Sequence, residues 1–242
     1  MSEIRRERLP DGIELLRLDR PAQRNAIGSA MLAELNGALA ELAADESLRV
    51  LVFSSTDPRA LCAGADVSEQ LDHEAGVARM AAFGEFYARV AGFPRPTVAV
   101  CTGNVVGAGA ELAAACDLRV GGENLKLLFP GAKLGVPVGP ARLTPLIGLA
   151  RAKEWIMTAK VVGIDEAERA GFVCARAPEA EAETVALALA GRLCEQSADG
   201  LAQLKGLFAE NEDLAERTAA ENELIVAFQR DGGTLPYRGA KG

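Results

Sequence analysis

Apolar residues recur with two different periods along the first three quarters of the chain. Residues 12–20, GIELLRLDR, alternate between apolar and polar and stop at a proline, which predicts a strand. Residues 49–55 and 96–103 are short, nearly continuous apolar runs, typical of strands that are buried on both faces. Between the first two segments, leucines recur at steps of three and four across residues 26–45, which predicts an amphipathic helix that Ser29 caps.

The same alternation of strand and helix patterns continues through the middle of the chain. A weaker helical pattern covers about residues 77–92. Residues 104–120 hold a loop, an alanine-rich helix and a short strand, in that order. Residues 141–160 have a helical pattern, and we expect an interruption before Pro145 because proline lacks the N–H that a helix interior needs.

The pattern becomes entirely helical toward the C-terminal end of the chain. Before that, residues 164–176 predict a capped helix that stops at Gly171 and leads into a last strand. From about Ala180 onward nearly every segment is helical. The order of elements therefore predicts an α/β fold, with a core over residues 1–190 and a helical C-terminal region over residues 191–242.

Composition narrows the class of protein. The chain has 242 residues, 49% of them hydrophobic, which is enough for one large domain or a domain with a small appendage. Its net charge of −8, without a basic run, argues against nucleic-acid binding. The charged N-terminal segment lacks the apolar core of a signal peptide, and no 18-residue apolar run occurs, so we expect a soluble cytoplasmic protein without a membrane partner.

Cysteine and histidine give no support for a metal site or a disulfide. The five cysteines are widely spaced without a CxxC pair, and we expect them to be small buried residues in a reducing compartment. His73 is the single histidine, which argues against a zinc site and against a Ser-His-Asp triad.

Two loops of very small residues follow two of the predicted strands. Residues 62–66 read CAGAD, and residues 107–111 read GAGAE at the start of the alanine-rich helix. Small side chains expose backbone N–H groups, and two such loops side by side could hold one developing negative charge, as in an oxyanion hole. A second interpretation is that the small residues of both loops only allow a helix to pack tightly on the sheet. A dinucleotide loop is a third alternative, but Leu112 stands where that motif needs glycine or alanine.

Five segments of the chain resemble the enoyl-CoA hydratase/isomerase (crotonase) superfamily, in the same order and spacing. The resemblance implies a spiral core of ββα units with a helical C-terminal region that forms trimers, often as dimers of trimers. It also implies acyl-CoA thioesters as ligands, with coenzyme A as part of the substrate and no separate cofactor or metal. The matching segments are RPAQRNAIGSAMLAEL, LCAGADVSE, PTVAVCTGNVVGAGAELAAACDLRV, LIGLARAKEWIMTAKVVGIDEAERAGFV and AFQRDGGTLPYRG.

The resemblance also implies roles for individual residues. The backbone amides of Ala65 and Ala108 take the places of the oxyanion donors, and Glu111 takes the place of one of two catalytic glutamates. Lys205, in the C-terminal helices, is either a contact to the coenzyme A of a neighbouring subunit or a solvated lysine. The remaining expected substrate contacts, among them a phosphate partner at Arg24, are Ala22, Arg24, Ala26, Ala63, Gly64, Asp66, Val67, Gly107, Pro130, Gly131 and Leu134.

The chain departs from the hydratase pattern at Gly131, where the family's second glutamate should stand after a proline. Hydration of a 2-enoyl-CoA with Glu111 as the acid/base remains the leading expectation. An isomerase, or an acyl-CoA-binding homologue with little or no catalysis, are the alternatives. We expect Gly131→Glu to raise hydratase activity unless pocket geometry limits it, and Val138 and Pro140 indicate a reshaped pocket. Loop residues that could replace the missing acid are Asp66, Glu69, Asp72, His73 and Glu74.

Overall fold

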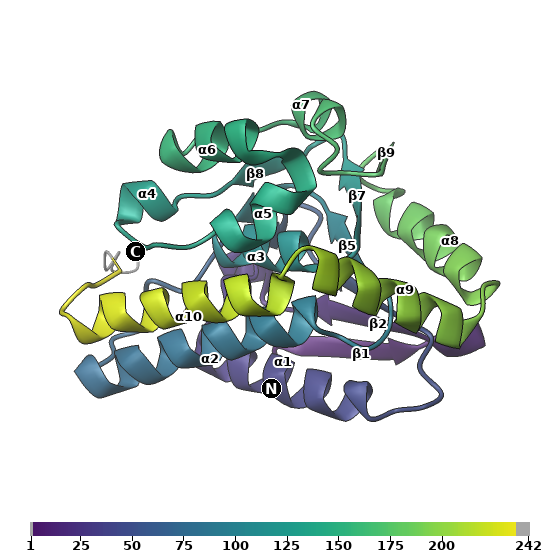
Figure 1. Cartoon of the computed structure of the whole chain (residues 1–242), viewed down its shortest axis with the longest axis horizontal. Coiled ribbons are helices and arrows are strands. Elements are labelled where there is room, and N and C mark those ends of the chain that lie inside the picture. The colour runs from purple at the N-terminus through teal and green to yellow at the C-terminus, as the bar shows by residue number, and fades with distance from the viewer. Residues whose placement is uncertain (1, 236–242) are drawn as a thin grey trace.

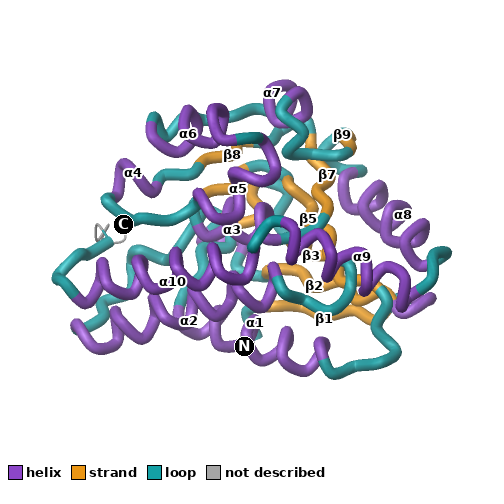
Figure 2. Tube along the Cα trace, in the orientation of Figure 1, coloured by secondary structure: helices purple, strands orange, loops and turns teal. Residues whose placement is uncertain are grey.

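A six-stranded sheet forms the centre of the computed structural model, in which residues 2–235 are described. The strand order is β1-β2-β3-β5-β7-β9, and all neighbours are parallel except the β1–β2 hairpin. Figure 2 shows these strands in orange, in this order from β1 at the bottom to β9 at the top. The strands are β1 (Ile4–Arg8), β2 (Ile13–Leu18), β3 (Val50–Ser55), β5 (Thr97–Cys101), β7 (Leu118–Gly122) and β9 (Ala175–Ala177).

A smaller parallel sheet with the order β4-β6-β8 lies beside the first. Its strands are β4 (Ala60–Cys62), β6 (Asn104–Val106) and β8 (Lys126–Leu128). Each strand of the small sheet follows directly on a strand of the large sheet, and a helix comes next. Three ββα units therefore succeed one another, which confirms the predicted spiral core.

Helices surround the two sheets (Figure 1). The helix α10 runs along α2. The helices α8, α9 and α10 follow one another without a strand between them, which confirms the predicted helical C-terminal region. No helix in the described range is long and apolar enough to cross a membrane. The helices are α1 (Ser29–Ala43), α2 (His73–Ala91), α3 (Ala108–Ala115), α4 (Gly131–Leu134), α5 (Pro140–Ile147), α6 (Leu149–Met157), α7 (Ile164–Arg169), α8 (Ala182–Cys194), α9 (Ala198–Asn211) and α10 (Leu214–Arg230).

The central strands bury both of their faces, as their continuous apolar composition predicted. On β3, Leu51 and Phe53 face the cluster that includes α1 and α2, whereas Val50 and Val52 face α8. The alternation follows from the period of two along a strand. Residue 190, the expected boundary of the core, lies within α8, whose buried alanines pack against the large sheet.

Two local predictions were wrong, and one strand was not predicted. The strand β1 was not predicted because four of its five residues are charged and exposed; two of them, Arg6 and Arg8, pair with the buried Glu14 of β2. Ser29 does not cap α1, since Gly28 is the cap residue and the serine hydroxyl bonds to a glutamate of another segment. The helix α5 continues through Pro145, and the break comes at Gly148, whose φ of +80° ends the helix.

Candidate active site

The two small-residue loops lie against each other at the edge of the small sheet. A Cβ added to Gly64 would lie 3.4 Å from the carbonyl oxygen of Val106, and one on Gly107 would lie 3.8 Å from the Cα of Gly64. The first loop is held by backbone hydrogen bonds to the neighbouring chain: Ile27 donates to Gly64, and Ala63 donates to Arg24. Segments more than forty residues apart in the sequence thus form one wall.

Glycine is required at two positions of the second loop. Gly107 precedes α3 with a φ of 50° and a ψ of −113°, a conformation that residues with a Cβ rarely adopt. A Cβ on Gly109 would lie 2.6 Å from the carbonyl oxygen of Cys62, so the first turn of α3 touches the first loop directly. Part of the glycine content therefore reflects packing, and this packing is what brings the two loops together.

Two backbone amides are left open by this arrangement. Among the described residues, neither the N–H of Ala65 nor that of Ala108 donates a hydrogen bond to the protein. Ala108 is the first residue of α3, where an N–H has no partner within the helix and the helix dipole favours negative charge. The pair can therefore serve as donors to one anionic oxygen.

Both loops line an apolar cavity of about 410 Å³. Tyr87, Glu111 and Lys133 are its polar side chains within the described part of the chain. Lys133 is exposed at the end of α4, so it lies at the rim. The remaining lining residues are Ala63, Gly64, Ala65, Val67, Met80, Phe83, Val106, Gly107, Ala108, Leu128, Pro130, Gly131, Leu134, Val136, Val138, Ile225 and Leu235.

Glu111 lies one turn into α3 and is only 1% exposed. Its Oε2 accepts a hydrogen bond of 2.9 Å from the Nε of Arg142 on α5. Arg142, 2% exposed, also donates from Nη2 to Glu221 of α10. The Glu221 carboxylate in turn accepts the N–H groups of Gly139 at 3.0 Å and Ala141 at 2.8 Å. The Oε1 of Glu111 accepts no hydrogen bond from any described residue, which leaves it available in the cavity wall.

Glu111, Arg142 and Glu221 form a cluster of buried ionisable groups whose charge depends on pH. If all three were charged, two carboxylates would face one guanidinium, and burial penalises the excess charge. Burial raises the pKa of Glu111 to about 7, with Arg142 opposing the shift and Glu221 adding to it. Although burial opposes its charge, the two carboxylates raise the pKa of Arg142 above its ordinary value. Glu111 can therefore exchange a proton near neutral pH, as a general acid/base must.

The place of the absent second glutamate is filled by backbone. A Cβ added to Gly131 would lie 2.7 Å from the carbonyl oxygen of Val136 and 3.1 Å from that of Val138. A larger side chain would have to displace this turn, which also lines the cavity. The expectation that Gly131→Glu would restore activity is therefore revised: geometry, as well as the missing acid, sets this wall.

None of the acidic loop residues considered as substitutes lines the cavity. Asp66 and Glu69 are each ion-paired with an arginine, at 3.0 Å. Asp72 caps α2 by accepting the N–H of Ala75, and His73 and Glu74 are exposed at the start of that helix. Within the described segments, Glu111 is the one carboxylate of the cavity.

The expected ligand contacts divide into two groups. Most line the cavity, but Ala22, Arg24, Ala26 and Asp66 do not. Ala22 and Arg24 are exposed in the loop next to Ala63, and no hydrogen bond or ion pair of the Arg24 side chain occurs among described residues. Lys205 pairs with Asp117 of its own chain at 2.6 Å.

Sequence reasoning missed the residues that distant helices bring to the site. Tyr87 comes from α2, Arg142 from α5 and Glu221 from α10. The guanidinium of Arg142 lies over the Tyr87 ring at 4.7 Å. One signal was present: Arg142 is the single charged residue of the mostly apolar stretch 134–149, which indicates a buried partner.

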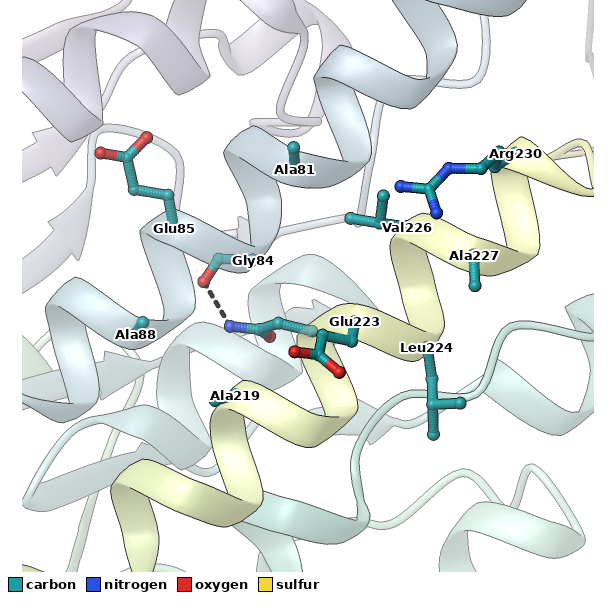
Figure 3. A pocket seen from close by; sticks show the side chains of 11 residues that line it. Ala81, Gly84, Glu85, Ala88, Ala219, Glu223, Leu224, Val226, Ala227 and Arg230 are labelled. Atoms are coloured by element: carbon teal, nitrogen blue, oxygen red, sulfur yellow. Dashed lines mark hydrogen bonds between the residues drawn. The ribbon is translucent and has the colours of Figure 1, made fainter.

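A second hollow of about 690 Å³ lies on the seam between α2 and α10 (Figure 3). Small residues line it, and Asn222 of α10 donates to the carbonyl of Gly84 on α2 at 2.8 Å. Glu85, Glu223 and Arg230 lie at its sides. No open amide pair comparable to that of the first cavity is found there among residues 2–235, and no cluster of side chains in this range could hold a metal ion.

Fold and site together define an α/β protein of ββα units whose apolar cavity presents two amides and one carboxylate. The chain belongs to the enoyl-CoA hydratase/isomerase family, whose sequence model matches residues 8–231.

Three relatives illustrate the similarity. The chain is 30% identical over 212 residues to the 2,3-dehydroadipyl-CoA hydratase of Escherichia coli K12, covering 86% of this chain and 83% of that protein. It is 39% identical over 176 residues to the human mitochondrial enoyl-CoA hydratase domain-containing protein 2, covering 68% of this chain and 58% of that one. The crystal structure of an enoyl-CoA hydratase/isomerase from Xanthobacter autotrophicus Py2 shares the fold, with a TM-score of 0.87, 23% identity and coverage of 96% and 89%.

Proposed function

We propose that the protein acts on acyl-CoA thioesters and hydrates a 2-enoyl-CoA through an enolate. The observation that carries the proposal is the placement of Glu111 and the Ala108 N–H on the first turn of one helix, beside the open Ala65 amide, in one apolar cavity. The cavity suits an acyl chain, since its lining is mostly aliphatic and aromatic.

In this proposal the two amides bind the thioester oxygen. They stabilise the negative charge that develops there, and one such donor typically contributes about 10²–10³ in rate. The Oε1 of Glu111 accepts a proton from the attacking water, while its Oε2 is held by Arg142. Because Oε2 is fixed, the orientation of the free oxygen Oε1 is also fixed. This orientation favours proton transfer from a water that is bound in one position.

Two alternatives remain. A 2-enoyl/3-enoyl isomerase needs one base that moves a proton between two carbons, and the single carboxylate of the cavity fits that requirement. A binding protein with little or no turnover is the other alternative, motivated by the Gly131 turn.

The deciding experiment adds crotonyl-CoA to purified protein and follows the loss of the conjugated thioester absorbance. We expect turnover in the wild type and a loss of about 10²–10⁴-fold in Glu111→Gln, with acyl-CoA binding retained. A 3-enoyl-CoA, assayed in the same way for gain of absorbance, tests the isomerase. Tight binding of acyl-CoA of several chain lengths without turnover would contradict both catalytic proposals.

The coenzyme A portion is proposed to lie along residues 22–25, next to the Ala63 carbonyl. Support comes from the exposed Arg24, whose charge acts on Asp57 but whose side chain makes no hydrogen bond or close ion pair within the described range. Its backbone carbonyl accepts a hydrogen bond of 3.0 Å from the N–H of Ala63. Coenzyme A enters as part of the substrate, and no separate cofactor is needed. A cytoplasmic location and the lack of nucleic-acid and membrane partners stay predictions.

A homotrimer, or a dimer of trimers, is the proposed assembly. Exposed apolar side chains on α9 support it, and Phe208 is 69% exposed while Leu204 and Leu207 are also exposed. Sedimentation of the wild type and of Phe208→Asp tests the surface. We expect a multiple of 25.3 kDa for the wild type and a smaller species for the variant; a monomeric wild type would contradict the proposal.

A further inference from the structure

The phenol of Tyr87 is the second buried side chain of the cavity, besides Glu111, that can transfer a proton. We propose that Tyr87 is a catalytic residue whose hydroxyl donates the proton that the α-carbon of the substrate receives. This inference rests on the proposed enolate chemistry. It assigns to a tyrosine of α2 the task for which the Gly131 turn offers no carboxylate.

Packing fixes the Tyr87 ring. It stacks on Phe83 with ring centroids 5.9 Å apart and contacts Phe86 at 5.8 Å. Its face lies against the guanidinium of Arg142, which also holds Glu111. One buried arginine therefore touches both groups and places them on neighbouring parts of the same cavity wall.

The hydroxyl itself is available to a ligand. It has no hydrogen-bond partner among the residues that the structure describes. The oxygen is not fully enclosed by protein, in contrast to the unpartnered Oγ1 of Thr218 on α10. Since Tyr87 lines the cavity, the open side of its oxygen is the cavity. A buried tyrosine normally satisfies its hydroxyl, so this one points to a ligand atom.

The electrostatic surroundings keep Tyr87 in its donor form. Burial, followed by the nearby charge of Glu111, raises the pKa of Tyr87 well above 10. Lys133 also lines the cavity, but it is exposed at the rim, where water competes for its ammonium group. The protonated phenol is thus the buried donor next to the buried base.

The proposed step balances. The oxygen of water bonds to the β-carbon while Glu111 takes one of its protons, and the electrons of the carbon–carbon double bond move onto the thioester oxygen. That electron pair then returns to form the bond between the α-carbon and the Tyr87 proton, which leaves a phenolate. Through an intervening water, the phenolate recovers a proton from the Glu111 carboxylic acid, whose pKa of about 7 makes the transfer favourable. The substrate gains one water, and the protein returns to its starting state.

Tyr87→Phe tests the proposal because it keeps the ring and its contacts with Phe83, Phe86 and Arg142 and removes only the oxygen. With crotonyl-CoA we expect kcat to fall about 10²–10⁴-fold while KM changes by less than about threefold. In D₂O, the rate at which deuterium enters the α-position of butyryl-CoA should fall by a similar factor. Thermal unfolding of the variant serves as the control for folding.

The outcomes separate the role of Tyr87 from the proposed function. Wild-type turnover that Tyr87→Phe leaves unchanged overturns the inference and leaves the hydratase proposal standing. A wild type that hydrates nothing but exchanges the α-hydrogens of butyryl-CoA refutes the hydratase alone, and Tyr87→Phe then tests the inference on exchange. A wild type with neither activity overturns both.

Discussion

Glu111→Gln should stabilise the protein at neutral and alkaline pH, although it removes the proposed acid/base. The variant keeps an oxygen that can accept the hydrogen bond from Arg142, which is 2.9 Å from the present carboxylate. It also reduces the buried cluster to one guanidinium and the single carboxylate of Glu221. The stability of the wild type therefore includes a cost that the variant lacks whenever Glu111 is ionised.

The cost follows from the pKa of Glu111, which burial raises from 4.5 to about 7. A raised folded-state pKa means that the folded protein binds the proton more tightly than the unfolded chain. The resulting stabilisation is complete below pH 4.5 and is lost as the pH rises through about 7. At about 1.4 kcal/mol per pKa unit, the loss in the wild type is on the order of 3 kcal/mol.

Urea unfolding of the two proteins between about pH 5 and about pH 8 measures the difference. Trp155 is the single tryptophan of the chain and is fully buried, so its fluorescence reports unfolding. The variant should gain stability over the wild type steadily across this range, by up to about 3 kcal/mol. Glu210→Gln, at an exposed glutamate of α9, is the matched control and should show no such trend.

A stability difference that does not change with pH would refute this reasoning. It would mean that Arg142 holds Glu111 as an anion throughout, in which case Glu111 is a structural carboxylate.

Three further predictions concern residues that line the cavity or pack behind its wall. Gly131→Glu should not raise hydratase activity and should lower the melting temperature, because its Cβ meets the Val136 carbonyl at 2.7 Å; a gain in turnover would show that the turn can yield. Gly109→Ala should lower kcat at least about tenfold, because the added Cβ pushes α3 away from the Cys62 carbonyl. The displacement should cost on the order of 1–3 kcal/mol of stability, and unchanged kinetics would contradict this prediction. Arg142→Met should lower the free energy of unfolding by about 3–5 kcal/mol in urea, since two buried carboxylates lose their cation, and a neutral effect would show that they are not charged.

Local sequence patterns predicted an α/β fold with a helical C-terminal region, whereas the family resemblance supplied the ββα units, the two amides and the role of Glu111. Continuous apolar runs predicted the strands that bury both faces, and the glycines of residues 107–111 marked the start of α3. Both are properties of a few consecutive residues, which periodicity can detect. The charged strand β1 escaped because its arginines find acidic partners on β2 and beyond, which no local pattern shows.

The rest of the site arises from contacts between distant segments. Tyr87, Arg142 and Glu221 stand on three helices, and their chemistry depends on how α2, α5 and α10 pack around α3. Gly131 was identified as a missing acid, but the carbonyls that occupy its surroundings belong to the turn that follows α4. The surroundings of these residues depend on tertiary packing, which a local sequence pattern does not show.

Hydrogen exchange at the α-carbon tests the central claim most directly, because it requires the enolate whichever acyl-CoA reaction follows. Butyryl-CoA is incubated in D₂O with the wild type and with Glu111→Gln, and deuterium at the α-position is measured by mass spectrometry. We expect exchange by the wild type. In the variant we expect a loss of at least about 10²-fold, because Tyr87 can remove an α-hydrogen only after its own proton has passed to Glu111, and butyryl-CoA should still bind to both proteins. Binding without exchange by the wild type, or equal exchange by both proteins, would contradict the central claim.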